Sequence, residues 1–193
     1  YGLTDWTFEI DDKGRPHYVV TNYKKRVGFK GSDATGAVIL AVQSGDIKEY
    51  SIADAPVWVD RIQPANMVNS QLDYWGKYGD GWLNSWLGAE GVLQSTEGIS
   101  LVYGNDGKSY FYTGMQSVGA DEGTIGFVLV NTRTKEARLY EQAGATETAA
   151  RQSGEDEFQD FGYQATYPIL YNIGGVPTYF MTLKASSGLV KGA

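Results

Sequence analysis

The chain has 193 residues, of which 42% are hydrophobic and 20% are charged, a composition that predicts a folded globular protein and excludes an intrinsically disordered one. Its formal net charge of −7 argues against nucleic acid as a partner, because a surface that binds phosphates needs an excess of Lys and Arg. There is no cysteine, which excludes disulfides, thiol catalysis and zinc–thiolate sites.

The first predicted elements are short β-favouring runs joined by tight turns. Residues 8–10 and 17–21 flank the sequence 11–14, whose Asp and Gly residues tolerate the positive φ angles that a hairpin requires. The apolar run 37–42 then predicts a buried strand, and residues 47–52 predict the strand that returns beside it. Together these segments predict an antiparallel meander of four strands.

A helix and an aromatic connector follow. Residues 56–75 carry apolar side chains at a broken helical spacing, with Pro64 as the expected interruption. In the next stretch, residues 72–87, three of the five tryptophans lie among tyrosines and glycines. We interpret it as a connector whose rings fill the seam between two units. The alternatives are a recognition surface for glycan or peptide and a contact with a membrane interface. The residues of such a surface are Tyr74, Trp75, Tyr78, Trp82 and Trp86.

The pattern of the first meander recurs in the second half. Residues 36–55 align without a gap with residues 126–145, with Gly, Val, Tyr and Ala at matching positions. Residues 14–21 align with residues 107–113 if one residue is deleted. Self-similarity at a long spacing indicates one supersecondary unit that is used more than once. A second meander is therefore expected, followed by a helix with Thr146 as its N-cap.

A third copy starts and stops early. Residues 175–182 align with residues 14–21 without a deletion, but the sequence ends near Gly192, where the pattern calls for a glycine followed by a buried strand. Two explanations stay open. The chain is a fragment of a longer one, which is the explanation that we prefer, or a strand from a neighbouring molecule completes the sheet. In the second case residues 1–10 are the expected donor.

The fold expected from these patterns is α+β, made of tandem antiparallel β-meander-plus-helix repeats with two complete units and a truncated third. The expected domains are repeat unit 1 in residues 1–75, an aromatic, Gly-rich connector in residues 76–98, repeat unit 2 in residues 99–161 and an incomplete repeat unit 3 in residues 162–193.

Two strand–turn–strand segments, residues 41–50 and 130–140, resemble the ending of PepSY-type domains, where a strand enters a tight turn and a second strand closes the sheet. The upstream hairpins that end at Gly14 and Gly107 are also similar to that family. More loosely, the chain resembles the extracytoplasmic part of larger membrane-anchored bacterial envelope proteins. The resemblance implies an extracytoplasmic place in the cell envelope and an association with protease inhibition or regulation. It also implies no cofactor and no catalytic residues.

The candidates for chemistry are few. His17 is the one histidine, so a Ser-His-Asp relay or an imidazole metal site would have to use it, and its matches in the other copies indicate an ordinary strand residue. The Asp-rich turn at residues 11–14 lacks the alternating oxygen ligands of an EF-type calcium loop. We therefore expect no catalytic residue, no metal and no cofactor.

The function expected is a non-catalytic, extracytoplasmic binding or structural module of a bacterial envelope protein, which binds a protein partner or assembles with itself through strand addition. A glycan is the alternative ligand. The competing hypothesis is a carbohydrate-active enzyme, because glycosidases need only two carboxylates, here beside the aromatic cluster of residues 75–86. The carboxylates considered are Asp60, Asp73, Glu90, Asp121 and Glu122.

Overall fold

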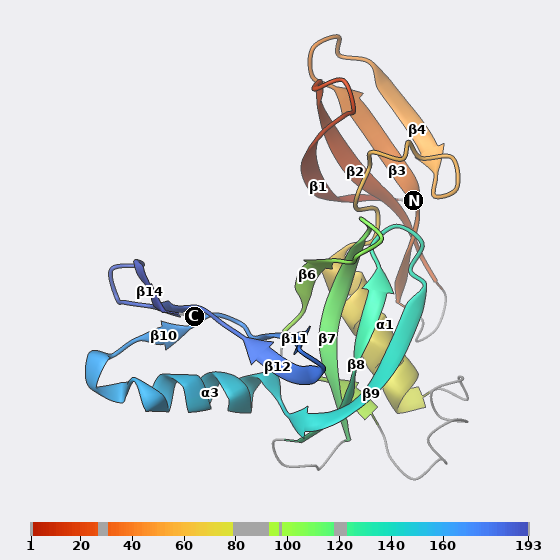
Figure 1. Ribbon diagram of the computed structural model, residues 1–193. Coiled ribbons are helices and arrows are strands. Elements are labelled where there is room, and N and C mark those ends of the chain that lie inside the picture. The colour runs from red at the N-terminus through yellow and green to blue at the C-terminus, as the bar shows by residue number, and fades with distance from the viewer. Residues whose placement is uncertain (1, 27–30, 79–92, 97, 118–122, 193) are drawn as a thin grey trace.

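Figure 1 shows the computed structural model of the chain, which describes residues 2–26, 31–78, 93–96, 98–117 and 123–192. Most of the described residues lie in antiparallel strands, and two α-helices accompany them. This arrangement confirms the predicted α+β class. Among the described residues, no helix is both long enough and apolar enough to span a bilayer.

The first sheet is a meander of β1 (Gly2–Ile10), β2 (Pro16–Lys25), β3 (Ser32–Ala41) and β4 (Ile47–Ser51), hydrogen-bonded in that order and antiparallel throughout. The predicted hairpin between β1 and β2 is confirmed: Gly14 has a φ of 75°, and its N–H donates to the Asp11 carbonyl at 2.8 Å. The segment expected to donate a strand to a neighbour, residues 1–10, thus supplies β1, which pairs with β2 of its own sheet.

The second sheet contains β6 (Ser100–Tyr103), β7 (Ser109–Ser117), β8 (Gly123–Asn131) and β9 (Ala137–Ala145), again as an antiparallel meander. The short strand β5 (Leu93–Ser95) pairs with the far half of β7. In this second sheet, the turn between β6 and β7 has the same geometry as the turn between β1 and β2, with Gly107 at a φ of 72°.

The two meanders have the same register at every strand pair. Ile10 lies opposite Pro16 and His17 opposite Ala41 in the first sheet. Tyr103 lies opposite Ser109, and Tyr110 opposite Asn131, in the second. Each residue of one meander therefore has a register equivalent, the residue that holds the same place in the other. The register needs no deletion in β7, so the expected match of Thr21 with Thr113 is wrong, and the register equivalent of Thr21 is Gly114.

Close contact between backbones accounts for the glycine shared by both sheets. A Cβ atom at Gly36 would lie 2.0 Å from the carbonyl oxygen of Tyr50, and one at Gly126 would lie 2.3 Å from that of Tyr140. Both distances are shorter than any non-bonded contact, so only glycine fits. The matched sequences of residues 36–55 and 126–145 therefore occupy matched strands.

The first helix, α1 (Ala65–Tyr78), starts directly after Pro64. The expected helix over residues 56–64 is wrong, because this linker is not helical. The backbone N–H groups of Ile62 and Gln63 donate instead to the carbonyl of Thr132, far away in the sequence. Asp60 consequently lies outside the helix on which it was expected.

Each sheet buries a different face. In the first sheet, Val19, Ala37 and Ile39 pack against Ala55, Val59 and Ile62 of the linker. In the second sheet, α1 covers the opposite face, where Val68 and Leu72 pack against a set of buried side chains: Phe111, Met115, Val128 and Val130. The helix expected to cover its own meander thus covers the next one, and the expected boundary at residue 75 falls inside α1.

The C-terminal part begins with α3 (Glu147–Glu157), where the predicted cap is confirmed because Thr146 accepts a hydrogen bond from the Ala149 N–H at 3.2 Å. The 3₁₀ helix η1 (Gln159–Phe161) follows. A three-stranded sheet then contains β10 (Gln164–Ala165), β13 (Leu183–Lys184) and β14 (Val190–Gly192), and a separate hairpin contains β11 (Ile169–Ile173) and β12 (Val176–Phe180).

The expectation of a truncated third meander is not confirmed in this region. Gly192 belongs to β14 and lies opposite Leu183. In β12, Pro177 lies opposite Asn172 across a two-residue turn, whereas its expected match Pro16 lies opposite Ile10 across a five-residue loop. The Gly174–Gly175 pair, with φ angles of 62° and 88°, makes this tighter turn.

Candidate functional site: two equivalent grooves

A large concave surface lies on the face of the second sheet that α1 does not cover. Side chains from β7, β8 and β9 form its floor, and Ile169, Leu170 and Tyr171 of β11 form a wall, around a volume of about 1020 Å³. We call it the large groove. The floor residues alternate along each strand, so they share one face of the sheet. They are Tyr110, Tyr112, Phe127, Leu129, Arg138 and Tyr140.

Stacked aromatic rings make up the centre of this floor. The rings of Phe127 and Tyr140 lie 5.1 Å apart with 11° between their planes, and Tyr112 lies 5.7 Å from Phe127. Tyr140 keeps 42% of its surface exposed. Flat rings of this kind offer a ligand a large apolar contact at a small cost in side-chain entropy.

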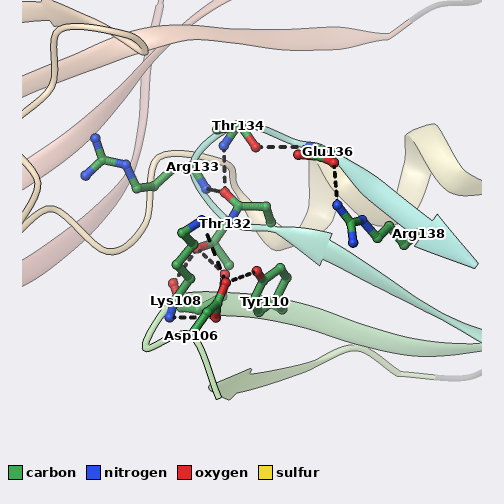
Figure 2. A network of polar contacts seen from close by, with 10 residues as sticks. Asp106, Lys108, Tyr110, Thr132, Arg133, Thr134, Glu136 and Arg138 are labelled. Atoms are coloured by element: carbon green, nitrogen blue, oxygen red, sulfur yellow. Dashed lines mark hydrogen bonds and ion pairs between the residues drawn. The ribbon is translucent and has the colours of Figure 1, made fainter. Parts of the chain in front are cut away.

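One end of the large groove carries a network of polar groups, shown in Figure 2. Asp106 accepts a hydrogen bond from the Tyr110 hydroxyl at 2.7 Å and lies 3.7 Å from the Lys108 ammonium. The Tyr110 hydrogen bond is the main reason that the pKa of Asp106 is lowered, so this carboxylate is ionised at neutral pH. Glu136 and Arg138 form a second ion pair at 3.2 Å. Asp106 and Glu136 therefore each have a basic partner in this network.

The rim beside this network is the turn between β8 and β9. The Asn131 side-chain oxygen accepts from the N–H groups of Arg133 at 3.0 Å and Thr134 at 2.9 Å. Lys135 completes the turn at a φ of 65°, the left-handed place that Gly45 holds in the first sheet. These local bonds fix the shape of the rim.

The linker after the first sheet anchors the same rim from outside. The Arg133 guanidinium points away from Tyr110 in Figure 2 and donates to three backbone carbonyls at 2.7–2.9 Å, those of Ala55, Pro56 and Val59. Thr132 donates its hydroxyl to the Asp60 carbonyl at 2.7 Å. The groove is thus built on a hydrogen-bonded junction between the two sheets.

A buried carboxylate supports the other end of the floor. Glu147, the first residue of α3, is 1% exposed and accepts a hydrogen bond from the Tyr112 hydroxyl at 2.9 Å. A Cβ atom at Gly114 would lie 2.6 Å from a Glu147 oxygen, so glycine makes room for the carboxylate. Burial and then the charge of Glu147 raise the pKa of Tyr112, and they raise the pKa of Tyr179 to about 12. These tyrosines therefore remain protonated hydrogen-bond donors.

A smaller groove of about 320 Å³ occupies the same face of the first sheet. Every residue that lines it, apart from Pro56 and Trp58, has its register equivalent in the lining of the large groove. The chemistry is preserved best on the last strand of each meander, where an acid, a base and a tyrosine stand at alternate positions. These residues are Asp46, Lys48 and Tyr50 in the first sheet and Glu136, Arg138 and Tyr140 in the second.

The histidine of the small groove is held by its neighbours. Its Nε2 lies 3.3 Å from Asp11, and its ring lies 4.7 Å from that of Trp58. The hydrogen bond from Arg15 is the main cause that lowers the pKa of Asp11. The serine of this groove, Ser44, donates its hydroxyl to Asp46 at 2.8 Å.

Two of the five aromatic residues predicted from the sequence, Tyr74 and Trp75, lie away from the large groove. Tyr74 is on α1 and 37% exposed, and Trp75 packs against the core of the second sheet, so both are on the opposite side of that sheet from the large groove. Tyr78 is the last residue of α1, and its side chain lies outside the described part. Trp82 and Trp86 lie outside the described residues.

Of the carboxylates considered for catalysis, the structure describes Asp60 and Asp73, and these two do not share a groove. Asp73 accepts hydrogen bonds from the N–H and the hydroxyl of Ser95 at 3.1 and 2.6 Å. Asp60 lines the large groove at the linker, and its N–H donates to Glu9. Glu90, Asp121 and Glu122 lie outside the described residues. In the part of the chain that the structure covers, no group of three or more acidic or histidine side chains could hold a metal ion.

Comparisons of the chain with protein-family models, with curated proteins and with solved structures found no match.

Proposed function

We propose that this chain is a non-catalytic, extracytoplasmic binding module of a bacterial cell-envelope protein, built from PepSY-like meander repeats. In this proposal both grooves can contact an extended segment of a protein partner, and the large groove supplies most of the affinity. The repetition of the acid, base and tyrosine at equivalent places in both grooves carries the argument. Asp46 and Lys48 are exposed, and packing does not require their charges, so a shared ligand chemistry explains why Glu136 and Arg138 repeat them.

The charges of the large groove favour binding over hydrolysis. The acid of a glycosidase has to stay protonated near neutral pH, which requires a raised pKa. The pKa of Asp106 is lowered instead, and Glu136 is paired with Arg138. Because its charges are already compensated, this end of the groove suits a ligand segment without net charge.

An extended peptide meets these conditions. Its backbone offers N–H and C=O groups to the polar end, at Lys108 and Glu136, and its apolar side chains can lie on the rings of Phe127 and Tyr140. The hydrogen bonds of Arg133 hold the rim of the groove to the linker, and a groove formed before the ligand arrives lowers the entropic cost of binding.

The test is a selection of random linear peptides on the full chain, followed by calorimetry with a selected peptide. Tyr140→Ala should weaken its binding about tenfold, since aromatic anchors of this type dominate such interfaces. The matched variant is Tyr74→Ala, a tyrosine of similar exposure on α1, and it should bind like the wild type.

Two results would refute the proposal. Weaker binding by Tyr74→Ala with normal binding by Tyr140→Ala would assign the site to the aromatic segment predicted from the sequence. Hydrolysis of a glycan panel by the wild-type chain, lost in Glu136→Gln, would make the protein a carbohydrate-active enzyme.

A further inference from the structure

The first sheet exposes an apolar face on the side opposite the small groove. Strand register places Trp6, Phe8 and Ile10 of β1 on the same side as Tyr18 of β2. A bulge at Asp5, whose φ is 56°, brings Leu3 to this side as well. With Ile47 of β4, these side chains form what we call the open apolar face. Their exposed fractions run from 42% at Tyr18 to 68% at Ile47.

Adjacent apolar side chains with this exposure are uncommon on a folded protein. Scattered exposed apolar residues are ordinary, but a contiguous patch marks a contact surface. On this face the rings of Phe8 and Tyr18 meet edge to face at 5.6 Å. Partly buried Val38 and Leu40 of β3 continue it across the sheet.

The register-equivalent face of the second sheet shows what fits there. Tyr18 corresponds to Phe111, which is 2% exposed because α1 lies on it. Val38 and Leu40 correspond to Val128 and Val130, which pack against the same helix. The two sheets thus share one pattern of strands and apolar positions. In the second sheet a helix covers this face, whereas none of the described elements covers it in the first.

We infer that the open apolar face binds an amphipathic α-helix of a partner, packed as α1 packs on the second sheet. The apolar stripe of α1, which contains Ala65, Val68, Leu72 and Trp75, is the pattern of side chains that such a helix presents.

Charge further defines the partner helix. Glu49 stands on the open apolar face where the second sheet has Leu139, and Asn22 donates a hydrogen bond to it. A natural partner helix should add Lys or Arg opposite Glu49 to this apolar stripe, so the stripe of α1 is the minimum that the face should bind. The same carboxylate and the net charge of −7 disfavour an anionic membrane surface as the occupant.

A synthetic peptide of residues 62–78, which carries the apolar stripe of α1, is the probe. With a fluorescent label it is titrated into the full chain, and binding is followed by anisotropy. Phe8→Lys and Ile47→Lys should each weaken binding about tenfold, because each places a charge in the contact. Both side chains are exposed, so these variants should fold. Leu189→Lys, at an exposed apolar residue far from this face in the fold, should bind like the wild type.

Each other result overturns the inference. No saturable binding of the peptide, or binding that Phe8→Lys and Ile47→Lys leave unchanged, means that the face does not accept such a helix. A wild-type dimer in light scattering that Phe8→Lys converts to a monomer means that a second copy covers the face. Co-sedimentation with phosphatidylglycerol vesicles that Phe8→Lys abolishes means that the face contacts a membrane. None of these variants alters a residue that lines the large groove, so the outcome is independent of the function proposed above.

Discussion

Replacing Gly126 by alanine tests the backbone contact that the two meanders share. The added Cβ would lie 2.3 Å from the carbonyl oxygen of Tyr140, and a carbonyl cannot rotate out of the way as a side chain can. Carbon and oxygen without a bond between them need about 3.3 Å, so β9 would have to move by about 1 Å. Overpacking of this type costs about 1–3 kcal/mol, and strained β8–β9 hydrogen bonds add to it. We expect the free energy of unfolding to fall by about 2–3 kcal/mol.

Urea unfolding followed by tryptophan fluorescence measures this change, and two further glycines serve as comparisons. At Gly144 the nearest atom would be 3.9 Å from an added Cβ, so Gly144→Ala should change the stability by less than about 0.5 kcal/mol. At Gly36 the distance to the Tyr50 oxygen is 2.0 Å, so Gly36→Ala should cost at least as much as Gly126→Ala. Equal losses at Gly126 and Gly144, or none at Gly126, would refute the reasoning.

Three further predictions concern the junction and the buried charges. Arg133→Ala leaves several backbone carbonyls without their donor and should lower the free energy of unfolding in urea by about 1–3 kcal/mol, while Arg133→Lys should recover only part of it. Because folding raises the pKa of Tyr179 from 10.0 to about 12, its stabilisation is complete below pH 10 and lost as the pH rises through 12. Absorbance at 295 nm should show a lower pKa for Tyr179 in Glu147→Gln than in the wild type. Folding lowers the pKa of Asp11, so its stabilisation is complete above pH 4 and lost on acidification, and acid unfolding of Asp11→Asn should show a weaker pH dependence.

Local chemistry made part of the fold predictable. The positive φ of Gly14 and Gly107 and the cap at Thr146 depend on residues within one turn of the chain, so the sequence alone indicates them. The start of α1 was not predictable in this way. The N–H groups of Ile62 and Gln63 donate to the carbonyl of Thr132, so residues before Pro64 are not helical. Because Thr132 is far away in the sequence, no pattern near residue 62 predicts this contact.

The site was predictable only in its chemistry. The alternation of acid, base and tyrosine at Glu136, Arg138 and Tyr140 is visible in the aligned repeats, and its period of two places these residues on one face of a strand. Which face stays open depends on where the linker and α1 pack. The wall from β11 also comes from a segment that the alignment assigned to an incomplete repeat.

One continuous segment accounts for the difference between the two grooves. After β4 the linker packs Val59 and Ile62 over the groove side of the first sheet, and the chain then crosses to the opposite side of the second sheet as α1. The linker narrows the first groove, while the second groove stays open and none of the described elements covers the far side of the first sheet. Ligand binding is therefore expected to depend on the large groove.

This asymmetry gives the last prediction. Tyr50 and Tyr140 are register equivalents, but Tyr50 packs against the first core, whereas Tyr140 is 42% exposed. Tyr50→Ala should therefore lower the free energy of unfolding by about 2–4 kcal/mol, through lost burial and a cavity, and leave peptide affinity within about twofold. Tyr140→Ala should instead weaken peptide binding about tenfold and change the free energy of unfolding less than Tyr50→Ala does. Urea unfolding measures the free energy of unfolding of both variants, and calorimetry measures their peptide affinity. Equal effects of the two substitutions on affinity would mean that both grooves bind ligand alike.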